Sequence, residues 1–401
     1  MLLPVSEALA RILDTARLSP IEQVSLNLAL GRILAKPIVA KRHQPPFNAS
    51  AMDGYAVRHG DLDQLPRKLK LIGISAAGHA FKGVVKTGTA VRILTGAPMP
   101  SGADTVVIQE NTQLDGSVIE IIQLTALGRN IRPKGLDFQK GTVLLSAGAK
   151  LGARDIGLAA SANAAMISVR KKPLVALFST GDELVQAGKS LRPDQITSSN
   201  GPALAAYVRS CGAEVLDLGI VRDDIKATTA AIKKAAMADI LVTTGGASVG
   251  DHDHVQAALK AAGVKIDFWK IAMRPGKPFM FGTKGRLRVL GLPGNPVAAL
   301  VCAQLFLRPL LEAMLGHRID VQSVLARLGS DLGANDQRQD YLRSTLTIAD
   351  DGSRTVTPHA TQDSSMQRVM RNADCLIIRP PFAPDVKAGD MVEILLFREG
   401  A

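Results

Sequence analysis

The stretch Leu241–His254, LVTTGGASVGDHDH, decides the fold of the central part of this 401-residue chain. Its first residues continue a short apolar run that begins at Asp239 and is typical of a buried strand. Gly245 and Gly246 interrupt that run, and a helical pattern, HVQAALKAAG, follows from His254. A buried strand that leads through a glycine-rich loop into a helix is the unit from which parallel α/β sheets are built.

Strand and helix patterns alternate on both sides of this stretch at the spacing of a parallel α/β sheet. The apolar runs that read as strands are PLVALFST, EVLDLGIV, DILVTT and RVLGL, which end at residues 180, 221, 244 and 292. Helical patterns cover 202–210, 226–238, 254–263 and 295–315. The sequence therefore predicts a parallel α/β domain over residues 171–318.

The flanking regions have different patterns. The first 45 residues are predicted to be mostly helical, and Ser19–Glu22 (SPIE) offers a capping box with proline at the first helical position. Short β-rich runs then alternate with Gly, Pro and Asp turns, and β-rich runs return near the C-terminus. We expect a helical linking domain of residues 1–45 plus 138–170, an inserted β domain of 46–137, the α/β domain of 171–318 and a C-terminal β domain of 319–401.

The amino-acid composition indicates which classes of ligand and which compartment are expected. The formal net charge of +12 favours anionic ligands, whereas an aromatic content of only 3% disfavours the stacking platforms of single-strand nucleic-acid binders. The three cysteines form no CxxC pair, which excludes a cysteine-rich zinc module and fits a reducing compartment. No secretory signal pattern and no membrane-length apolar run is evident. We expect a cytoplasmic protein without nucleic-acid or membrane partners.

Three loops of unusual composition follow the predicted strands. They are Ser179–Leu184 (STGDEL), the opening stretch, and Gly291–Pro296 (GLPGNP), which leads into a helix. Ligands of open parallel sheets bind beyond the carboxyl ends of the strands, where glycines permit close approach and helix N-termini attract anions. The chain has neither a GxxxxGK[ST] nor a GxGxxG motif. Spacing alone thus predicts a phosphate-binding site of no common nucleotide class.

Charged residues add to this interpretation. The loop Met273–Pro278 (MRPGKP) holds Arg274 and Lys277 between prolines that restrict the backbone, an arrangement suited to an oxyanion. Carboxylates in these loops would repel a phosphate group unless a Mg²⁺ ion lay between them. Mg²⁺ in proteins is usually bound by one or two carboxylates together with phosphate oxygens of the substrate. Zinc at His252 and His254 is the weaker alternative, because no third ligand is close in sequence. The acids concerned are Asp182, Glu183, Asp251 and Asp253.

Motifs spread over most of the chain carry a resemblance to a known family. In chain order they are SAMDGYAV (50–57), RILTGAPMPSGADTVV (92–107), RPKGLDF (132–138), STGDEL (179–184), SSNGPAL (198–204), TTGGASVGDHD (243–253), MRPGKP (273–278) and GLPGNPVAAL (291–300). Together they resemble the molybdopterin molybdenumtransferases, the family of bacterial MoeA proteins and the gephyrin E domain. The family usually has Lys where Arg274 stands, and Arg presents a planar fork rather than a point charge.

The resemblance implies a multidomain α/β plus β fold: a parallel α/β molybdopterin-binding domain, a helical domain, an inserted β domain and a C-terminal β-barrel-like domain. It implies a homodimer that takes molybdate and adenylylated molybdopterin as substrates. The expected reaction is Mg²⁺-dependent hydrolysis of the adenylate with insertion of molybdenum at the dithiolene and release of AMP. It also leaves open a contact with the molybdopterin adenylyltransferase.

Motif position in the resemblance, together with the composition of the three loops, assigns three groups of site residues. The catalytic group is Asp53, Thr95, Asp137, Glu183, Arg274 and Lys277; the substrate-binding group is Gly245, Gly246, Ser248, Gly250, Pro293, Gly294, Asn295, Pro296, Arg343 and Ser364; and the metal group is Glu183, Asp253 and one of Asp223 and Asp224. Two other functions stay open, a molybdopterin adenylyltransferase-like enzyme and a non-catalytic molybdopterin-binding scaffold. The β domains argue against the first, and the retained Asp53, Glu183 and Asp253 argue against the second.

Overall fold

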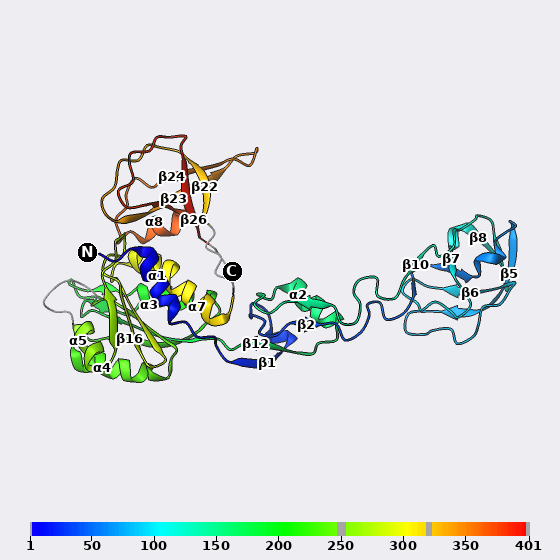
Figure 1. The fold of residues 1–401 in the computed structure, drawn as a ribbon, viewed down its shortest axis with the longest axis horizontal. Helices are drawn as coiled ribbons and strands as arrows, with labels where there is room; N and C mark the ends of the chain where they lie inside the picture. The colour runs from blue at the N-terminus through cyan, green and yellow to red at the C-terminus, as the bar shows by residue number, and fades with distance from the viewer. Residues whose placement is uncertain (1, 247–253, 318–322, 398–401) are drawn as a thin grey trace.

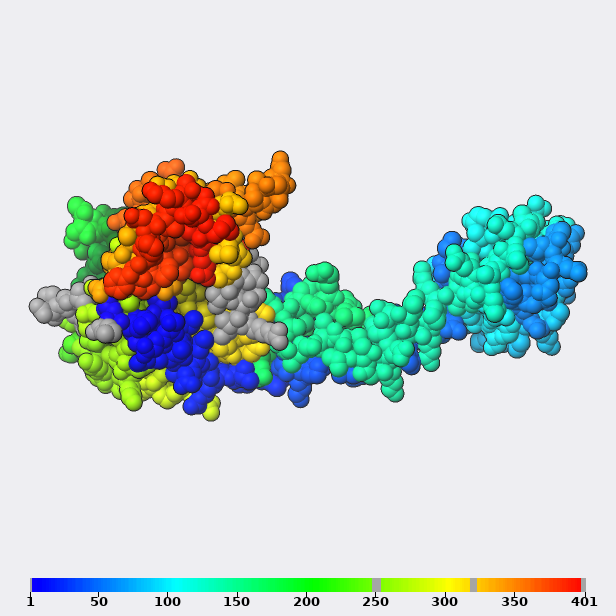
Figure 2. Space-filling model, turned by 45° about the horizontal axis from the view of Figure 1, so that its top comes forward, coloured from blue at the N-terminus to red at the C-terminus, as the bar shows by residue number. Residues whose placement is uncertain are grey.

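The molecule is elongated, with two compact ends joined by a narrow segment (Figure 1). The computed structural model describes residues 2–246, 254–317 and 323–397. The α/β sheet and the C-terminal β domain lie together at one end, and the inserted β domain lies alone at the other (Figure 1). Figure 2 shows that only the thin linking segment bridges the two.

The α/β domain is built on a six-stranded sheet in the order β16-β13-β17-β21-β20-β18. Its first four strands are parallel, and β20 and β18 are added antiparallel at one side. Apolar residues cover both faces, which is why these strands read as nearly continuous apolar runs. The strands are β13 (Leu174–Thr180), β16 (Glu214–Val221), β17 (Ile240–Thr244), β18 (Lys265–Trp269), β20 (Met280–Lys284) and β21 (Leu287–Leu292).

Helices cover both faces of this sheet. One face packs against α3, α6, η5 and α7 together with α1, and the other against α4 and α5. The continuous helical run from Pro296 to Leu315 is long and apolar enough to cross a membrane, but 83% of its most apolar window is buried inside the protein. Its apolar character is therefore explained by the core. The helices are α1 (Val5–Asp14), α3 (Asn200–Ser210), α4 (Ile225–Lys234), α5 (His254–Ala261), α6 (Pro296–Cys302) and α7 (Arg308–Leu315), with the 3₁₀ turn η4 (Ala235–Met237) and the π-helical segment η5 (Ala303–Leu307) between α6 and α7.

The linking segment corrects the prediction that the first 45 residues are mostly helical. Helix α1 forms but packs on the α/β domain, and Ile21–Ser25 is a strand, β1, paired antiparallel with β12. The expected capping box fails because this pairing buries Val24 in the segment's own core, so tertiary contacts override the local pattern. The elements here are β1 (Ile21–Ser25), η1 (Leu26–Leu28), β2 (Ile38–Val39), β11 (Val143–Leu145), α2 (Ala153–Ser161) and β12 (Met166–Arg170).

The inserted β domain contains a six-stranded sheet in the order β7-β4-β6-β5-β9-β8 and a small β3–β10 pair. Strand β4 needs glycine at Gly54, because a Cβ there would lie 2.0 Å from the carbonyl oxygen of Val107. The elements are β3 (Ala49–Ser50), β4 (Gly54–Val57), η2 (His59–Asp61), β5 (Arg67–Ser75), β6 (Thr89–Ile93), β7 (Thr105–Ile108), η3 (Gln109–Asn111), β8 (Thr112–Asp115), β9 (Val118–Ile121) and β10 (Ile131–Arg132).

The C-terminal domain is a closed five-stranded barrel, which confirms the β-barrel-like prediction. The ring runs β23-β24-β22-β26-β25 and closes by pairing β25 with β23. A short strand from the basic loop of the α/β domain, β19 (Met273–Arg274), pairs with β23 and joins the two domains. The barrel elements are β22 (Ser323–Leu328), β23 (Gln339–Ile348), β24 (Arg354–Pro358), α8 (Gln367–Asn372), β25 (Cys375–Arg379) and β26 (Met391–Leu396).

Candidate functional site

The loops that follow β13, β17 and β21 meet at one edge of the sheet. The strands are in register, with Ser179 opposite Thr244 and Thr244 opposite Leu292, so the three loops leave the sheet at the same level. A Cβ on Gly294 would lie 3.6 Å from Cα of Gly245, and a Cβ on Gly245 would lie 2.2 Å from the carbonyl oxygen of Thr180. Glycine is therefore needed at Gly245, whereas at Gly294 a Cβ would make only an ordinary van der Waals contact.

Asn200, at the start of α3, ties two of the loops together. Its Nδ2 donates to Oγ1 of Thr244 (2.8 Å) and to the carbonyl oxygen of Gly294 (2.7 Å). Thr244 in turn donates to the carbonyl oxygen of Pro293 at 3.2 Å. The motif SSNGPAL contains Asn200, but its place among the site residues was missed. A polar triplet immediately before a helix was the only sequence feature pointing to it.

A cavity of about 380 Å³ opens between these loops and the C-terminal domain. On the barrel side, Oγ of Ser364 accepts from Nδ2 of Asn295 at 2.7 Å, and Gln367 donates to the hydroxyl of Ser199. The backbone also connects the domains, because the N–H of Val297 donates to the carbonyl oxygen of Ser364 at 3.0 Å. The residues lining this cleft are Thr180, Glu183, Leu184, Ile196–Asn200, Thr244, Gly245, Gly294–Pro296, Ser365 and Gln367.

Glu183 and its neighbours place carboxylates at the rim of this cleft. A Cβ on Gly181 would lie 2.6 Å from both carboxylate oxygens of Glu183, so glycine makes room for that side chain. The next loop is close, because the backbone N–H of Asp223 donates to Oδ1 of Asp182 at 3.3 Å. Within the described residues, Oδ1 of Asp223 is buried and has no hydrogen-bond partner. Asp224 differs: its Oδ1 accepts from the N–H of Ala227 at 2.8 Å and caps α4.

The two cations of the basic loop have different surroundings. Arg274 forms a two-pronged pair with Asp340 of the barrel, from Nε to Oδ1 (2.9 Å) and from Nη2 to Oδ2 (2.6 Å). Lys277 is exposed and forms no ion pair with any described residue. It lies at the same edge of the sheet as the cleft, since Met280 just beyond it pairs with Gly291 near the end of β21. The arrangement leaves Lys277 as the more available cation.

Arg343 supports the cleft from inside the barrel. It is only 1% exposed, and its Nη2 donates to the carbonyl oxygen of Asp363 at 3.4 Å, next to Ser364. Burial lowers the pKa of its guanidinium to about 10, against the opposing effect of Asp363. Among the described atoms, its Nε has no partner.

A second set of predicted residues lies in the inserted β domain. Oδ1 of Asp53 accepts from the backbone N–H of Thr95 (2.6 Å) and from its hydroxyl (2.8 Å). The antiparallel pairing of Gly54 with Ile93 brings the two residues together. The Thr95 backbone and hydroxyl hydrogen bonds, with a weaker contribution from Arg92, lower the pKa of Asp53 below its usual value. Asp137 is exposed where the chain returns to the linking segment, and its N–H donates to the carbonyl oxygen of Gln44 at 2.9 Å.

The structure thus divides the predicted site between the two ends of one chain (Figure 1). The described part of the chain holds no group of three or more His, Cys, Asp or Glu side chains that could enclose a metal ion. Ser248, Gly250 and Asp253, predicted for substrate and metal binding, lie outside the described residues.

Comparison with known families matches nearly the whole chain. Residues 3–163 match the family model described as MoeA N-terminal region (domain I and II), and residues 176–313 match the probable molybdopterin binding domain. Residues 325–397 match the MoeA C-terminal region (domain IV). The three matches follow one another in the order of the structural units.

Individual relatives cover the same length. A protein of Haemophilus influenzae named molybdopterin molybdenumtransferase is 36% identical over 95% of this chain and 97% of its own. A protein of the same name from Bacillus subtilis is 33% identical over 99% of this chain and 94% of its own. A crystal structure of a molybdopterin biosynthesis MoeA protein from Pyrococcus horikoshii superposes with a TM-score of 0.87 at 31% identity, covering 99% of this chain and 100% of that one.

Proposed function

The chain belongs to the MoeA family of molybdopterin molybdenumtransferases, and on that premise we propose that it hydrolyses adenylylated molybdopterin with Mg²⁺, inserts molybdenum at the dithiolene and releases AMP. Its place in molybdenum cofactor biosynthesis as a transferase follows from the family. The substrate, the metal dependence and the released product are the proposal. The observation that carries it is the cleft formed by three strand-end loops and closed by the C-terminal domain.

This cleft suits a phosphate-containing ligand. Gly245 and Gly294 leave backbone exposed at its floor, and α3 directs the N–H groups of its first turn toward the same space. Lys277 supplies a positive charge at the same edge of the sheet. Phosphoryl hydrolysis in proteins depends mainly on positioning and charge, which these groups provide without a nucleophilic side chain.

The carboxylates at the rim fit Mg²⁺. The buried Oδ1 of Asp223 lacks a partner among the described residues, and the Glu183 carboxylate lies exposed in the adjacent loop. We infer that Glu183 and Asp223 hold the ion and that Asp224, already engaged as a helix cap, does not. Asp253 remains a proposed further ligand. When bound, Mg²⁺ would neutralise phosphate charge in the cleft.

The inserted β domain completes the site from a second copy of the chain. Asp53, Thr95 and Asp137 cannot serve the cleft of their own chain, because the linking segment separates the two ends (Figure 2). That segment exposes large apolar side chains: Leu28 and Leu30 are each 69% exposed. We propose that they are covered in a symmetric homodimer, in which the inserted domain of each copy faces the other's cleft.

In that arrangement the residues have separate tasks. Asp53, kept ionised by Thr95, would orient the substrate or the water that attacks the adenylate. Lys277 would bind oxyanions, and Ser364 and Arg343 would shape the end of the cleft where molybdate enters. Arg274 would hold the basic loop to the barrel through Asp340. We further propose that the enzyme works in the cytoplasm.

The decisive experiment follows AMP release from adenylylated molybdopterin, with and without molybdate and Mg²⁺. AMP release that depends on both additions, with molybdenum appearing in the pterin, is the expected result. Transfer of AMP from MgATP onto molybdopterin would instead identify an adenylyltransferase-like enzyme. Tight binding of the adenylate without AMP release would identify a non-catalytic scaffold.

A further inference from the structure

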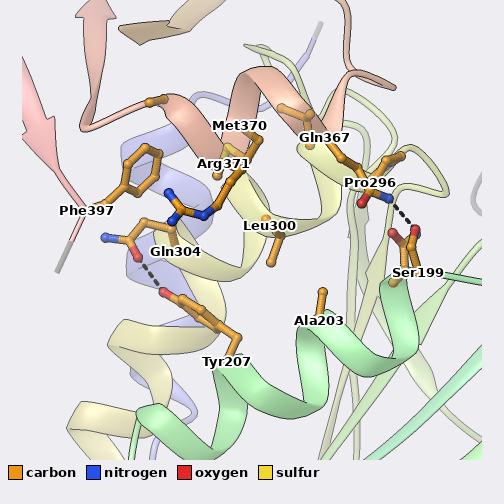
Figure 3. A pocket seen from close by; sticks show the side chains of 13 residues that line it. Ser199, Ala203, Tyr207, Pro296, Leu300, Gln304, Gln367, Met370, Arg371 and Phe397 are labelled. Carbon is orange, nitrogen blue, oxygen red and sulfur yellow. Dashed lines mark hydrogen bonds between the residues drawn. The ribbon is translucent and has the colours of Figure 1, made fainter. Parts of the chain in front are cut away.

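A second cavity, of about 330 Å³, opens beside the cleft between α3, the α6–η5 helix and α8 (Figure 3). Four residues line both spaces: Ser199, Asn200, Pro296 and Gln367. The second cavity therefore adjoins the cleft, and we call it the side chamber. Its volume lies within the range of roughly 300–1,000 Å³ found for small-molecule sites.

The walls of the side chamber are apolar and come from opposing helices. Ala203 lines it from α3 and Leu300 from α6, with Met370 of α8 and Phe397 closing the remaining sides (Figure 3). Ala203 and Tyr207 on one helix, and Leu300 and Gln304 on the other, are four residues apart and so lie on the same helix face. A slot between two such faces favours a flat ligand.

The end of the side chamber away from the cleft is polar and offers donors. The hydroxyl of Tyr207 donates to Oε1 of Gln304, which leaves the Nε2 group of that amide as a donor (Figure 3). The guanidinium of Arg371 also lines the chamber, and it makes no hydrogen bond or ion pair to any residue that the structure describes. An arginine can only donate, so this end is complementary to a ring carbonyl or another strong acceptor.

We propose that the side chamber binds the pterin ring of the substrate while the cleft holds its phosphate groups. This inference rests on the proposed function, because the cleft supplies the second attachment point. A pterin is flat and carries a ring carbonyl that could accept from Arg371 and Gln304. Adenine, the other flat ring of the substrate, has no carbonyl to accept from Arg371 and Gln304.

The test measures equilibrium binding of metal-free molybdopterin and, separately, of AMP to the full-length protein. Ala203→Phe should fill the chamber and Arg371→Gln should remove its charged donor. Each should weaken molybdopterin binding by roughly tenfold or more and leave AMP binding unchanged. Ala187→Phe is the matched control, because Ala187 lines a different cavity of about 420 Å³ beside β16 and should change neither affinity.

Several outcomes would overturn the proposal: wild-type molybdopterin affinity in both chamber variants, an equal loss of AMP affinity, or a loss that appears in Ala187→Phe instead. Arg371 is exposed, so Arg371→Gln decides the matter even where Ala203→Phe fails to fold. AMP release is assayed in parallel on the wild type. A wild type that binds molybdopterin yet releases no AMP would reject the proposed function and leave the pterin site standing.

Discussion

The two ends of this molecule hold their polar groups in different ways. At the α/β end, loops from three neighbouring strands surround a cleft of about 380 Å³ whose floor is mostly backbone and whose carboxylates stand at the rim. At the distal end, a single antiparallel strand pair fixes one carboxylate, Asp53, with two hydrogen bonds from Thr95. The α/β end thus has a cavity that can hold a ligand, and the distal end has an ionised carboxylate held in place by hydrogen bonds.

Under the proposed function, neither end is a complete site by itself. The cleft can hold a ligand, but the carboxylate on its lining is not fixed by hydrogen bonds, because the Glu183 side chain makes none with a described residue. The distal end has a carboxylate fixed by hydrogen bonds but no cavity among those described around Asp53. A symmetric pair of chains would supply both at each of two sites.

Substituting one carboxylate at each end of the molecule should have the largest effect on the rate of AMP release. Asp53→Ala and Glu183→Ala should each reduce AMP release by roughly a hundredfold or more, the scale seen when a positioned active-site group is lost. Both variants should remain folded, because both side chains are exposed. Circular dichroism and size-exclusion chromatography provide the control for folding and assembly.

Mixing the two inactive variants tests whether the site is shared. In a mixed dimer one site carries both substitutions and the other carries neither. After subunit exchange in equal amounts, roughly a quarter of the wild-type rate should return, since half the dimers are mixed and each has one intact site. No recovery despite demonstrated exchange would mean that Asp53 and Glu183 serve the same chain.

The basic loop offers a smaller contrast between binding and stability. Lys277→Ala should raise KM by roughly tenfold through loss of a charge-assisted contact, with the melting temperature unchanged. Arg274→Ala should lower stability by about 1–3 kcal/mol, because the carboxylate of Asp340, 4% exposed, loses its partner. Kinetics and thermal melts of both variants separate the roles. Stability loss in Lys277→Ala alone would reverse them.

The distal carboxylate predicts a pH effect. Thr95→Val removes the hydroxyl donor but keeps the backbone N–H, so the pKa of Asp53 should rise toward its ordinary value. In the proposed function Asp53 acts when ionised, so a higher pKa should move the acid limb of the pH–kcat/KM profile to higher pH. Near neutral pH Asp53 stays ionised in both proteins, so the rate there should change little. An acid limb that stays in place would exclude Asp53 as the titrating group.

Sequence reasoning predicted most of the fold because the strands of the α/β domain are short apolar runs between clear helix patterns. It failed at Ile21–Ser25, where pairing with β12, nearly 150 residues away, determined the structure. The candidate site was likewise only partly predictable from the sequence. Loops such as Pro293–Pro296 were evident from composition, but the contacts of Asn200 across two loops depend on packing that no local pattern shows.

The smallest expected effects concern the adjacent acids Asp223 and Asp224 at the α/β end. Sequence could not choose between these adjacent acids, whereas the structure leaves Oδ1 of Asp223 without a described partner and engages Asp224 with Ala227. Asp224→Ala should cost about 1 kcal/mol of stability through loss of the α4 cap and leave the Mg²⁺ requirement unchanged. Asp223→Ala should instead raise the Mg²⁺ concentration needed for half-maximal AMP release by several-fold, with little change in the melting temperature. If Asp224→Ala alone shifted that concentration, Asp224 at the start of α4 would be the Mg²⁺ ligand and Asp223 would not.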